Sequence, residues 1–199
     1  MRPIYLASQS PRRRQLLDQL GIAHELLLPE PHEDAEALEA TREGEAPAAY
    51  AQRVTRAKLE AAEQRRVRLG LPERRILCAD TTVALGERIL GKPADAQEAV
   101  AMLRALSGRV HEVHSAVALA DGAQRREALS SSRVWVAELP EAVIADYGAS
   151  VDADGPMGKA GAYAIQGRFA AWIERIEGSH SGIIGLPLFE TAQLLWKTS

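Results

Sequence analysis

The stretch IYLASQSPRRRQLLDQLG, residues 4–21, runs directly from a short apolar segment into a helical pattern. Its first four residues predict a short buried strand. Ser10 is a favourable N-cap and Pro11 suits the first helical position, so a helix is expected to begin there. Apolar residues three or four apart continue to Leu20, and Gly21 predicts the end of the helix. The stretch therefore reads as a strand, a turn and a helix.

The same alternation of strands and helices continues along the chain. The predicted strands cover residues 24–28, 76–79, 110–120, 132–136 and 170–176, with a hairpin over 83–90. The predicted helices cover 47–69, 96–106, 140–147 and 187–195, and segments 29–46 and 149–161 are expected to be loops. This pattern predicts an α/β fold with a mixed central sheet. No repeat or linker interrupts it, so residues 1–199 are expected to form one domain.

Composition limits the possible functions. The chain has 199 residues, of which 46% are apolar, and its formal net charge is −3, whereas general nucleic-acid binders are usually basic. Cys78 is the only cysteine, which excludes a disulfide framework and a cysteine-based zinc site. No apolar run approaches the roughly 18–20 residues that span a bilayer, and the first apolar stretch is too short for a signal peptide. We therefore expect a cytoplasmic protein with neither nucleic acid nor membrane as a partner.

Three arginines, Arg12 to Arg14, fall in the first turn of the first predicted helix. Cations at this end of a helix are unfavourable by about 0.3–1 kcal/mol each. They are either ordinary solvated side chains or part of an anion site. In an anion site, backbone N–H groups, the hydroxyls of Ser8 and Ser10 and the guanidinium groups would bind phosphate together. This turn alone leaves both interpretations open.

Three later positions carry polar groups suited to a nucleotide. Asp80 follows the apolar run 76–79, and acids at the carboxyl ends of strands lie where α/β sheets place ligands. Lys92 lies in a tight turn after the predicted hairpin. Gln166, in the glycine-rich segment 159–167, offers both a donor and an acceptor to a nucleobase edge. Each has an ordinary alternative, as a turn residue, a solvated lysine and a loop residue.

The acids of the 29–46 segment are candidates for a hard cation. Glu33 and Asp34 are the foremost of them, since Mg²⁺ takes few carboxylates and shares the phosphates of its substrate. Most acids in a mobile loop are nevertheless only solvated. The chain contains no Walker loop, no G-x-S-x-G elbow and no H-E-x-x-H zinc motif. Known short motifs therefore do not assign the reaction.

Taken in order, six segments resemble the Maf family of nucleoside triphosphate pyrophosphatases. They are LASQSPRR at 6–13, ADT at 79–81, GKP at 91–93, MLRALSG at 102–108, KAGAYAIQG at 159–167 and GLPLFET at 185–191. The resemblance implies an elongated, ITPase-related α/β domain with a central cleft, often dimeric. It also implies hydrolysis of a nucleoside triphosphate to the monophosphate and pyrophosphate with a divalent cation, Mg²⁺ or Mn²⁺.

The resemblance also implies roles for single residues. Asp80 is the implied catalytic acid, as a base or as a metal ligand, and Glu33 is implied to bind the metal with it. The substrate contacts fall on Ser8, Arg12, Arg13, Lys58 and Lys92, with Ser10 added by the anion-site argument. The form KAGAYAIQG is similar to the branch that acts on dTTP and UTP, in which Arg12, Thr81 and Gln166 match positions associated with base choice.

Three positions depart from the family pattern. The family often has two adjacent acids where this chain has His32 and Glu33, a glutamate at Ala57 and an acid at Gly158. These departures concern the metal more than the activity. An alternative function is a nucleotide-binding regulator of cell division that acts by binding. A weaker alternative is an RNA-binding domain that uses the arginine cluster, against which the net charge and the few aromatic residues argue.

Overall fold

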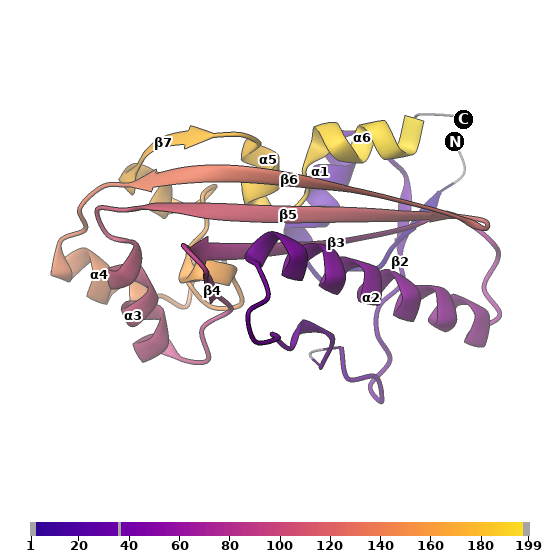
Figure 1. Cartoon of the computed structure of the whole chain (residues 1–199), viewed down its shortest axis with the longest axis horizontal. Coiled ribbons are helices and arrows are strands. Elements are labelled where there is room, and N and C mark those ends of the chain that lie inside the picture. The colour runs from indigo at the N-terminus through magenta and orange to yellow at the C-terminus, as the bar shows by residue number, and fades with distance from the viewer. Residues whose placement is uncertain (1–2, 36, 197–199) are drawn as a thin grey trace.

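One mixed sheet organises the structure, a computed structural model that describes residues 3–35 and 37–196 (Figure 1). The strand order is β2-β1-β3-β5-β6-β7, and β4 pairs with β3 outside this path. β1 (Ile4–Leu6) is parallel to β2 (His24–Leu26) and to β3 (Ile76–Leu85), and the other pairs are antiparallel. The predicted α/β fold with a mixed sheet is therefore confirmed.

The remaining strands are β4 (Arg88–Leu90), β5 (Val110–Asp121), β6 (Gln124–Val136) and β7 (Ile173–Glu177). β6 starts eight residues before the predicted position 132, because a tight turn joins it to β5 and the two strands pair continuously from that turn onward. Its first residues are polar and exposed, so they gave no apolar signal. β7 starts at 173 instead of 170, because residues Arg168–Trp172 form a 3₁₀ turn, η3.

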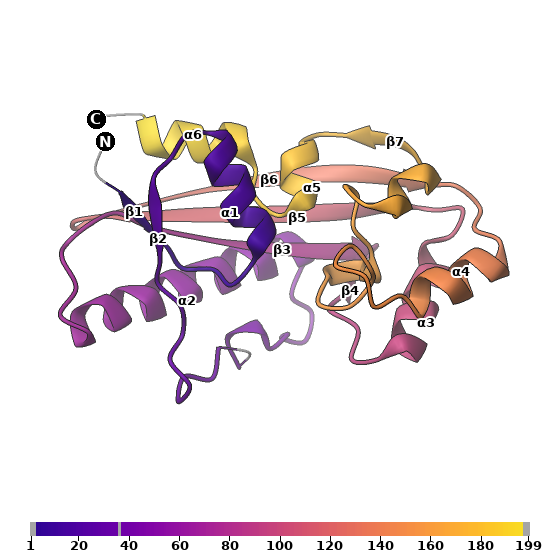
Figure 2. The ribbon, with the colours of Figure 1, turned by 180° about the vertical axis from the view of Figure 1, so that it is seen from behind.

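Helices cover both faces of the sheet (Figures 1 and 2). They are α1 (Pro11–Gln19), α2 (Pro47–Arg68), α3 (Ala96–Leu106), α4 (Glu141–Gly148), α5 (His180–Ile184) and α6 (Leu188–Trp196). α2 packs on one face against β3 and β5, while α5 and α6 pack on the other face, with α1 beside α5. The short helix α5 was not predicted, because five residues cannot display a helical period.

Side chains of β3 alternate between the two faces. Leu77 and Ala79 belong to an apolar cluster with α1 and α6, whereas Ile76 and Cys78 belong to a cluster with α2. Cys78 is fully buried, and this burial raises the pKa of its thiol to about 12. Because strand side chains alternate strictly, the two residues that follow Ala79 are also directed to opposite faces.

β3 has an open edge over residues 78–82 in the described pairings. β1 pairs with β3 only as far as Leu77, and β4 begins its pairing at Val83. Asp80 was predicted at the end of a strand that stops at 79, and this prediction is wrong, because β3 continues to Leu85. The strand that ends there is β1, and Asp80 lies just beyond the level at which β1 stops pairing. Asp80 therefore lies within β3, next to the carboxyl end of its parallel neighbour β1, which is where α/β sheets place ligands.

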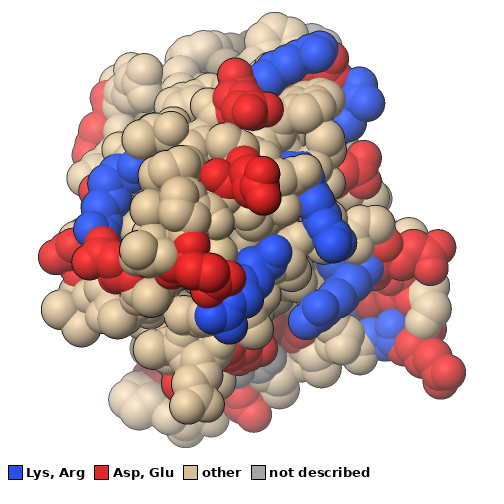
Figure 3. All heavy atoms as spheres, turned by 90° about the vertical axis from the view of Figure 1, so that its left-hand side faces the viewer, with Lys and Arg blue, Asp and Glu red and all other residues tan. Residues whose placement is uncertain are grey.

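One end of the molecule carries mixed charge (Figure 3). At the end with α3 and α4, acidic and basic side chains are interspersed on the surface (Figure 3). Between these two helices, Arg104 and Glu141 form an ion pair of 2.7 Å. Within the described ranges, no helix is long and apolar enough to cross a membrane.

Candidate active site

A cavity of about 470 Å³ opens along the open edge of β3. Distant parts of the chain line it, including the turn 7–13, β3, the segment 89–92 after its hairpin, and residues 158–166 and 183–185. Its described charged lining consists of the basic residues Arg12, Arg13, Lys58, Arg65 and Lys92 and the acids Glu39 and Asp80. Five cations against two anions give the lining residues a net charge of +3, or +2 when Glu33, which pairs with Arg65 from outside the lining, is counted, and this excess favours an anionic ligand.

Arg12 and Arg13 are fixed at the N-terminus of α1 by backbone carbonyls. Arg13 Nε donates to Gly185 O at 2.8 Å, and Arg12 Nε donates to Ile184 O at 3.3 Å. Arg13 Nη1 also donates to Ser8 Oγ at 3.1 Å. These two side chains are therefore held in place and are not ordinary solvated arginines, whereas the third arginine of the cluster is exposed.

Burial affects the electrostatics of this pair. Burial lowers the pKa of the Arg13 guanidinium, and the negative charge of Asp80 opposes the shift. Arginine remains charged at neutral pH, so two fixed cations stand at a helix N-terminus whose first backbone N–H groups lack partners within the helix. Such an arrangement is suited to phosphate oxygens.

Ser10 does not cap α1 as predicted. It occupies the N-cap position, but its side chain makes no capping hydrogen bond. Instead, the backbone N–H of Ser10 donates to Ser8 Oγ at 3.2 Å, which makes the turn compact and brings Ser8 beneath Arg13. Both serines line the cavity, and their binding of phosphate stays a prediction.

Lys58 joins Asp80 to α2. Its Nζ donates to Asp80 Oδ1 at 2.6 Å and to Glu39 Oε1 at 2.7 Å. Asp80 is only 7% exposed, and its second oxygen accepts a hydrogen bond of 3.4 Å from Thr82. α2 positions this lysine because the apolar face that carries Leu59 packs on β3. Two carboxylates thus converge on one ammonium group.

Glu39 is a cavity residue that sequence reasoning did not single out. It ends the 3₁₀ turn η1 (Ala37–Glu39), and Lys92 Nζ donates to its Oε2 at 2.9 Å. Tyr50 of α2 holds the turn by donating to the Glu39 carbonyl at 2.7 Å. Burial raises the pKa of Glu39, but Lys58 and Lys92 together lower it by more, so the net shift of this pKa is downward. Nothing in the sequence distinguishes this acid from its neighbours.

Glu33 is placed outside the cavity lining. Its carboxylate accepts hydrogen bonds from Arg65 and Arg68 of α2, and the bond from Arg65 lowers the pKa of Glu33 to about 2. Its ligand atoms and those of Glu30 and His32 lie within 4.8 Å of one another. The Glu30 carboxylate is itself bound to Arg68 at 2.8 Å. The structure thus engages Glu33 in ion pairs, and its role as a metal ligand stays a prediction.

The glycine-rich segment meets the turn that carries Lys92. The backbone N–H of Gly161 donates to Gly91 O at 3.1 Å. A Cβ at position 161 would lie 2.8 Å from Val83, and the residue has φ +69°, so glycine is required here. The next residue, Ala162, also has a positive φ of 59°, a strained conformation of the kind found at ligand sites.

The three residues that the family resemblance links to base choice all line the cavity. Thr81 Oγ1 lies 2.8 Å from Ser115 Oγ and donates to Gly185 O at 3.3 Å, on the face of the sheet opposite Lys58. Gln166 is exposed, and its Nε2 donates to Asp154 Oδ1 at 3.2 Å. With Arg12, these residues lie around the end of the cavity formed by α1, α5 and the glycine-rich segment.

The donor set in the cavity fits a hard divalent cation. Asp80 and Glu39 contribute carboxylate oxygens, the ligand type that Mg²⁺ and Mn²⁺ prefer, and substrate phosphates would add further oxygens. Both carboxylates are bound to the ammonium group of Lys58. A metal ion can therefore take both as ligands only if this ammonium group moves from the carboxylates to a phosphate of the substrate.

Comparison with known proteins gives consistent matches. The family model described as Maf-like protein matches residues 3–198. The dTTP/UTP pyrophosphatase of Polaromonas sp. is 60% identical over 192 residues, covering 96% of this chain and 94% of that protein. The proteins of the same name from Albidiferax ferrireducens and Cupriavidus metallidurans are 58% and 59% identical, with the same coverage. A solved nucleoside-triphosphatase (dITP/XTP pyrophosphatase) of Mycobacterium abscessus is 18% identical with a TM-score of 0.41, covering 69% of this chain and 76% of that one, a likeness too weak to argue from.

Proposed function

Because this chain belongs to the Maf family, we propose that it hydrolyses dTTP and UTP to their monophosphates and pyrophosphate. It is thus a nucleoside triphosphate pyrophosphatase. The observation that carries the proposal is the position of the Asp80 carboxylate, which stands in a cavity with five basic side chains. A triphosphate needs that excess of cations, and attack by water needs a carboxylate beside them.

The triphosphate lies along the cationic side of the cavity. Arg12 and Arg13 at the helix N-terminus, with the hydroxyls of Ser8 and Ser10, bind one part of it. Lys58 and Lys92 bind the remainder. Both ammonium groups point into the cavity and bind the carboxylate of Glu39 there, and phosphate oxygens can take the place of that carboxylate. The base lies toward Thr81 and Gln166, with Arg12 between the base and the phosphates.

The reaction breaks the bond between the α-phosphorus and the oxygen that bridges it to the β-phosphate. Water attacks the α-phosphorus in line, Asp80 orients it and accepts its proton, and pyrophosphate leaves with the bridging oxygen. The transition state spreads negative charge over the phosphoryl oxygens, so the cations of Arg13 and Lys58 supply most of the stabilisation.

A divalent cation, Mg²⁺ or Mn²⁺, is the proposed cofactor. Asp80 would hold it, with Glu39 as the second carboxylate of the cavity; Glu33, the other proposed ligand, would first have to leave Arg65 and Arg68. When bound, such an ion neutralises phosphate charge and polarises the bond to the leaving group.

The remaining assignments are proposals of the same kind. They are a cytoplasmic location, a homodimer, and action on modified pyrimidine nucleotides in addition to the two named substrates. A regulator of cell division that only binds nucleotide has no observation in its favour, since binding alone does not need Asp80 beside the phosphate site.

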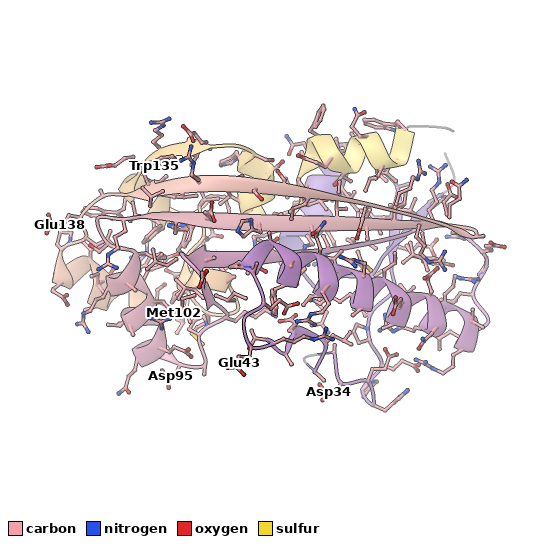
Figure 4. The ribbon with its side chains drawn as sticks, viewed as in Figure 1. Asp34, Glu43, Asp95, Met102, Trp135 and Glu138 are labelled. Atoms are coloured by element: carbon pink, nitrogen blue, oxygen red, sulfur yellow. The ribbon has the colours of Figure 1, made fainter. Side chains whose placement is uncertain are left out.

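Pyrophosphate release from a panel of nucleotides tests the proposal. The panel is dTTP, UTP, CTP, GTP, ATP and 7-methyl-GTP with Mg²⁺, and release from dTTP and UTP is expected to predominate. Asp80→Asn is expected to lower this turnover roughly 10²-fold or more, the usual loss for a general base. The matched control is Asp95→Asn, which removes an exposed carboxylate (Figure 4) while asparagine still caps α3.

Two outcomes contradict the proposal. If the wild-type protein releases no pyrophosphate from dTTP or UTP, the assigned activity is wrong. If Asp80→Asn retains the wild-type rate in a preparation free of wild-type enzyme, Asp80 is not the catalytic residue.

A further inference from the structure

Asp154 contacts one of the residues proposed to read the base and acts electrostatically on another. Gln166 Nε2 donates to Asp154 Oδ1 at 3.2 Å. Asp154 also acts on Arg12, because burial lowers the pKa of that guanidinium and the negative charge of Asp154 raises it. Asp154 is not part of the cavity lining, so any effect that it has on a bound base must pass through a neighbour.

The chemistry of a carboxylate fixes the orientation of the Gln166 amide. An ionised carboxylate can only accept hydrogen bonds, whereas a glutamine amide has a donating NH₂ at one corner and an accepting oxygen at the other. The NH₂ group of Gln166 must therefore face Asp154, and the opposite orientation would set two acceptors against each other. Oε1 is then the corner of the amide available to a ligand.

The backbone that carries Asp154 is itself anchored. Lys159, only 5% exposed, donates from Nζ to Ala153 O at 2.8 Å and to Gly155 O at 2.6 Å, on either side of Asp154. Tyr147 donates to the carbonyl of Asp154 at 2.7 Å. The buried lysine and the tyrosine thus hold three consecutive residues in one conformation.

The position of the Asp154 side chain also depends on a glycine. A Cβ at Gly167 would lie 2.6 Å from Asp154 Cβ, so the aspartate packs directly on the glycine backbone next to Gln166. A larger residue at 167 would push Asp154 away from the amide. The contact between Asp154 and Gln166 is therefore supported by both loop segments that form it.

We propose that Asp154 is a positioning residue that turns Gln166 Oε1 toward the base and thereby selects nucleobases with an imide N–H. This inference rests on the proposed function and extends it to base choice. Thymine and uracil carry a hydrogen on N3, which can donate to Oε1. Cytosine has the same ring size but an unprotonated N3, so it sets a lone pair against Oε1. A site that satisfies one pattern disfavours the other, because two acceptors then face each other without a hydrogen between them.

The test is the ratio of kcat/KM for dTTP to that for dCTP. In Asp154→Asn the new amide can donate as well as accept, so Gln166 is free to turn and to present its NH₂ to cytosine. The ratio is expected to fall about ten-fold, the value of one hydrogen bond. The change is expected in the KM values of the two nucleotides, while kcat for dTTP is largely kept. Asp152→Asn, on the same exposed loop, is the matched control and leaves the ratio unchanged.

Two further variants separate positioning from a structural role. Asp154→Glu keeps a carboxylate and is expected to restore most of the ratio. In a Gln166→Ala background, Asp154→Asn is expected to have no further effect on the ratio, because its effect passes through Gln166.

The outcomes are distinct. If Asp154→Asn loses kcat/KM equally on dTTP and dCTP, or leaves their ratio unchanged, the inference is overturned. Hydrolysis of dTTP by the wild-type protein upholds the proposed function in that case. A wild-type protein that hydrolyses neither nucleotide contradicts the proposed function, and this inference with it.

Discussion

Two consecutive residues, Asp80 and Thr81, contact different parts of the protein because β3 directs their side chains to opposite faces. Asp80 meets Lys58 of α2 on one face, and Thr81 meets Ser115 and Gly185 on the other. Both still line the cavity, because no strand covers this edge of β3 among the described pairings. Two adjacent residues of one strand thus present their side chains to the cavity from opposite faces of the sheet.

Glu39 occupies the two lysines that we propose to bind the triphosphate. Its carboxylate binds both Lys58 and Lys92, so an incoming phosphate must displace it. Glu39→Gln removes that competing charge, and pyrophosphate binding to the metal-free protein is expected to become about five-fold tighter, the size of a half-buried ion pair. Isothermal titration of pyrophosphate measures this.

The control for that variant is Glu43→Gln. Glu43 lies on the same segment at its outer edge (Figure 4), and its loss is expected to leave pyrophosphate affinity unchanged. Weaker pyrophosphate binding by the Glu39 variant would show that Glu39 assists the ligand instead of competing with it.

The residues that the sequence could identify are those within continuous motifs. Ser8, Arg13, Lys92 and Gln166 stand in segments whose order and spacing resemble one family, and the structure brings them to one cavity. Glu39 and Asp154 could not be identified in this way. Each lies in an irregular loop, and its importance depends only on which side chain the fold places beside it.

At the scale of elements, the sequence predicted most helices and strands but not all of their bounds. Proline and aspartate mark the starts of α1, α2 and α3 by local rules, and all three helices begin within one residue of prediction. The length of β3 and β6 depends on the partner strand, since polar residues extend a strand once β5 lies beside them. Such lengthening is a property of the pairing and leaves no local pattern.

An ion-paired clip joins the 29–46 segment to α2. The hydrogen bond from Arg65 lowers the pKa of Glu33 to about 2, below its ordinary 4.5, while Arg65 also donates to Leu27 O at 3.0 Å. The clip therefore stabilises the fold fully above pH 4.5, and its contribution is lost as pH falls toward 2. Glu33→Gln is expected to lower the free energy of unfolding by about 2–3 kcal/mol at pH 7.

Urea unfolding of wild type and Glu33→Gln from pH 7 to pH 3 measures the clip. The difference between the two proteins should shrink steadily below pH 4.5, while Asp34→Asn, an exposed neighbour (Figure 4), should differ little from wild type at any pH. A constant difference across this range would mean that the charge of Glu33 is not what stabilises the segment.

At the scale of the molecule, the site depends on a short strand. β1 has three residues and β3 has ten, so most of β3 extends beyond its parallel neighbour. Four segments surround the uncovered edge of β3, and the cavity lies between them: the turn after β1, the end of the β3–β4 hairpin, and residues 158–166 and 183–185. The alternation of strands and helices predicted an α/β sheet, but only the three-dimensional pairing shows where the sheet is incomplete.

The fully buried thiol of Cys78 provides a chemical probe for the opening of the sheet. Cys78 is the only cysteine, it lies in β3 two residues before Asp80, and burial raises its pKa to about 12. A disulfide reagent such as DTNB should therefore react at once with the urea-unfolded chain and only slowly with the native protein. Saturating pyrophosphate should slow the native reaction further, because it binds folded molecules only. Immediate labelling of the native protein would contradict this; otherwise the labelling rate measures how often β3 opens to solvent next to Asp80.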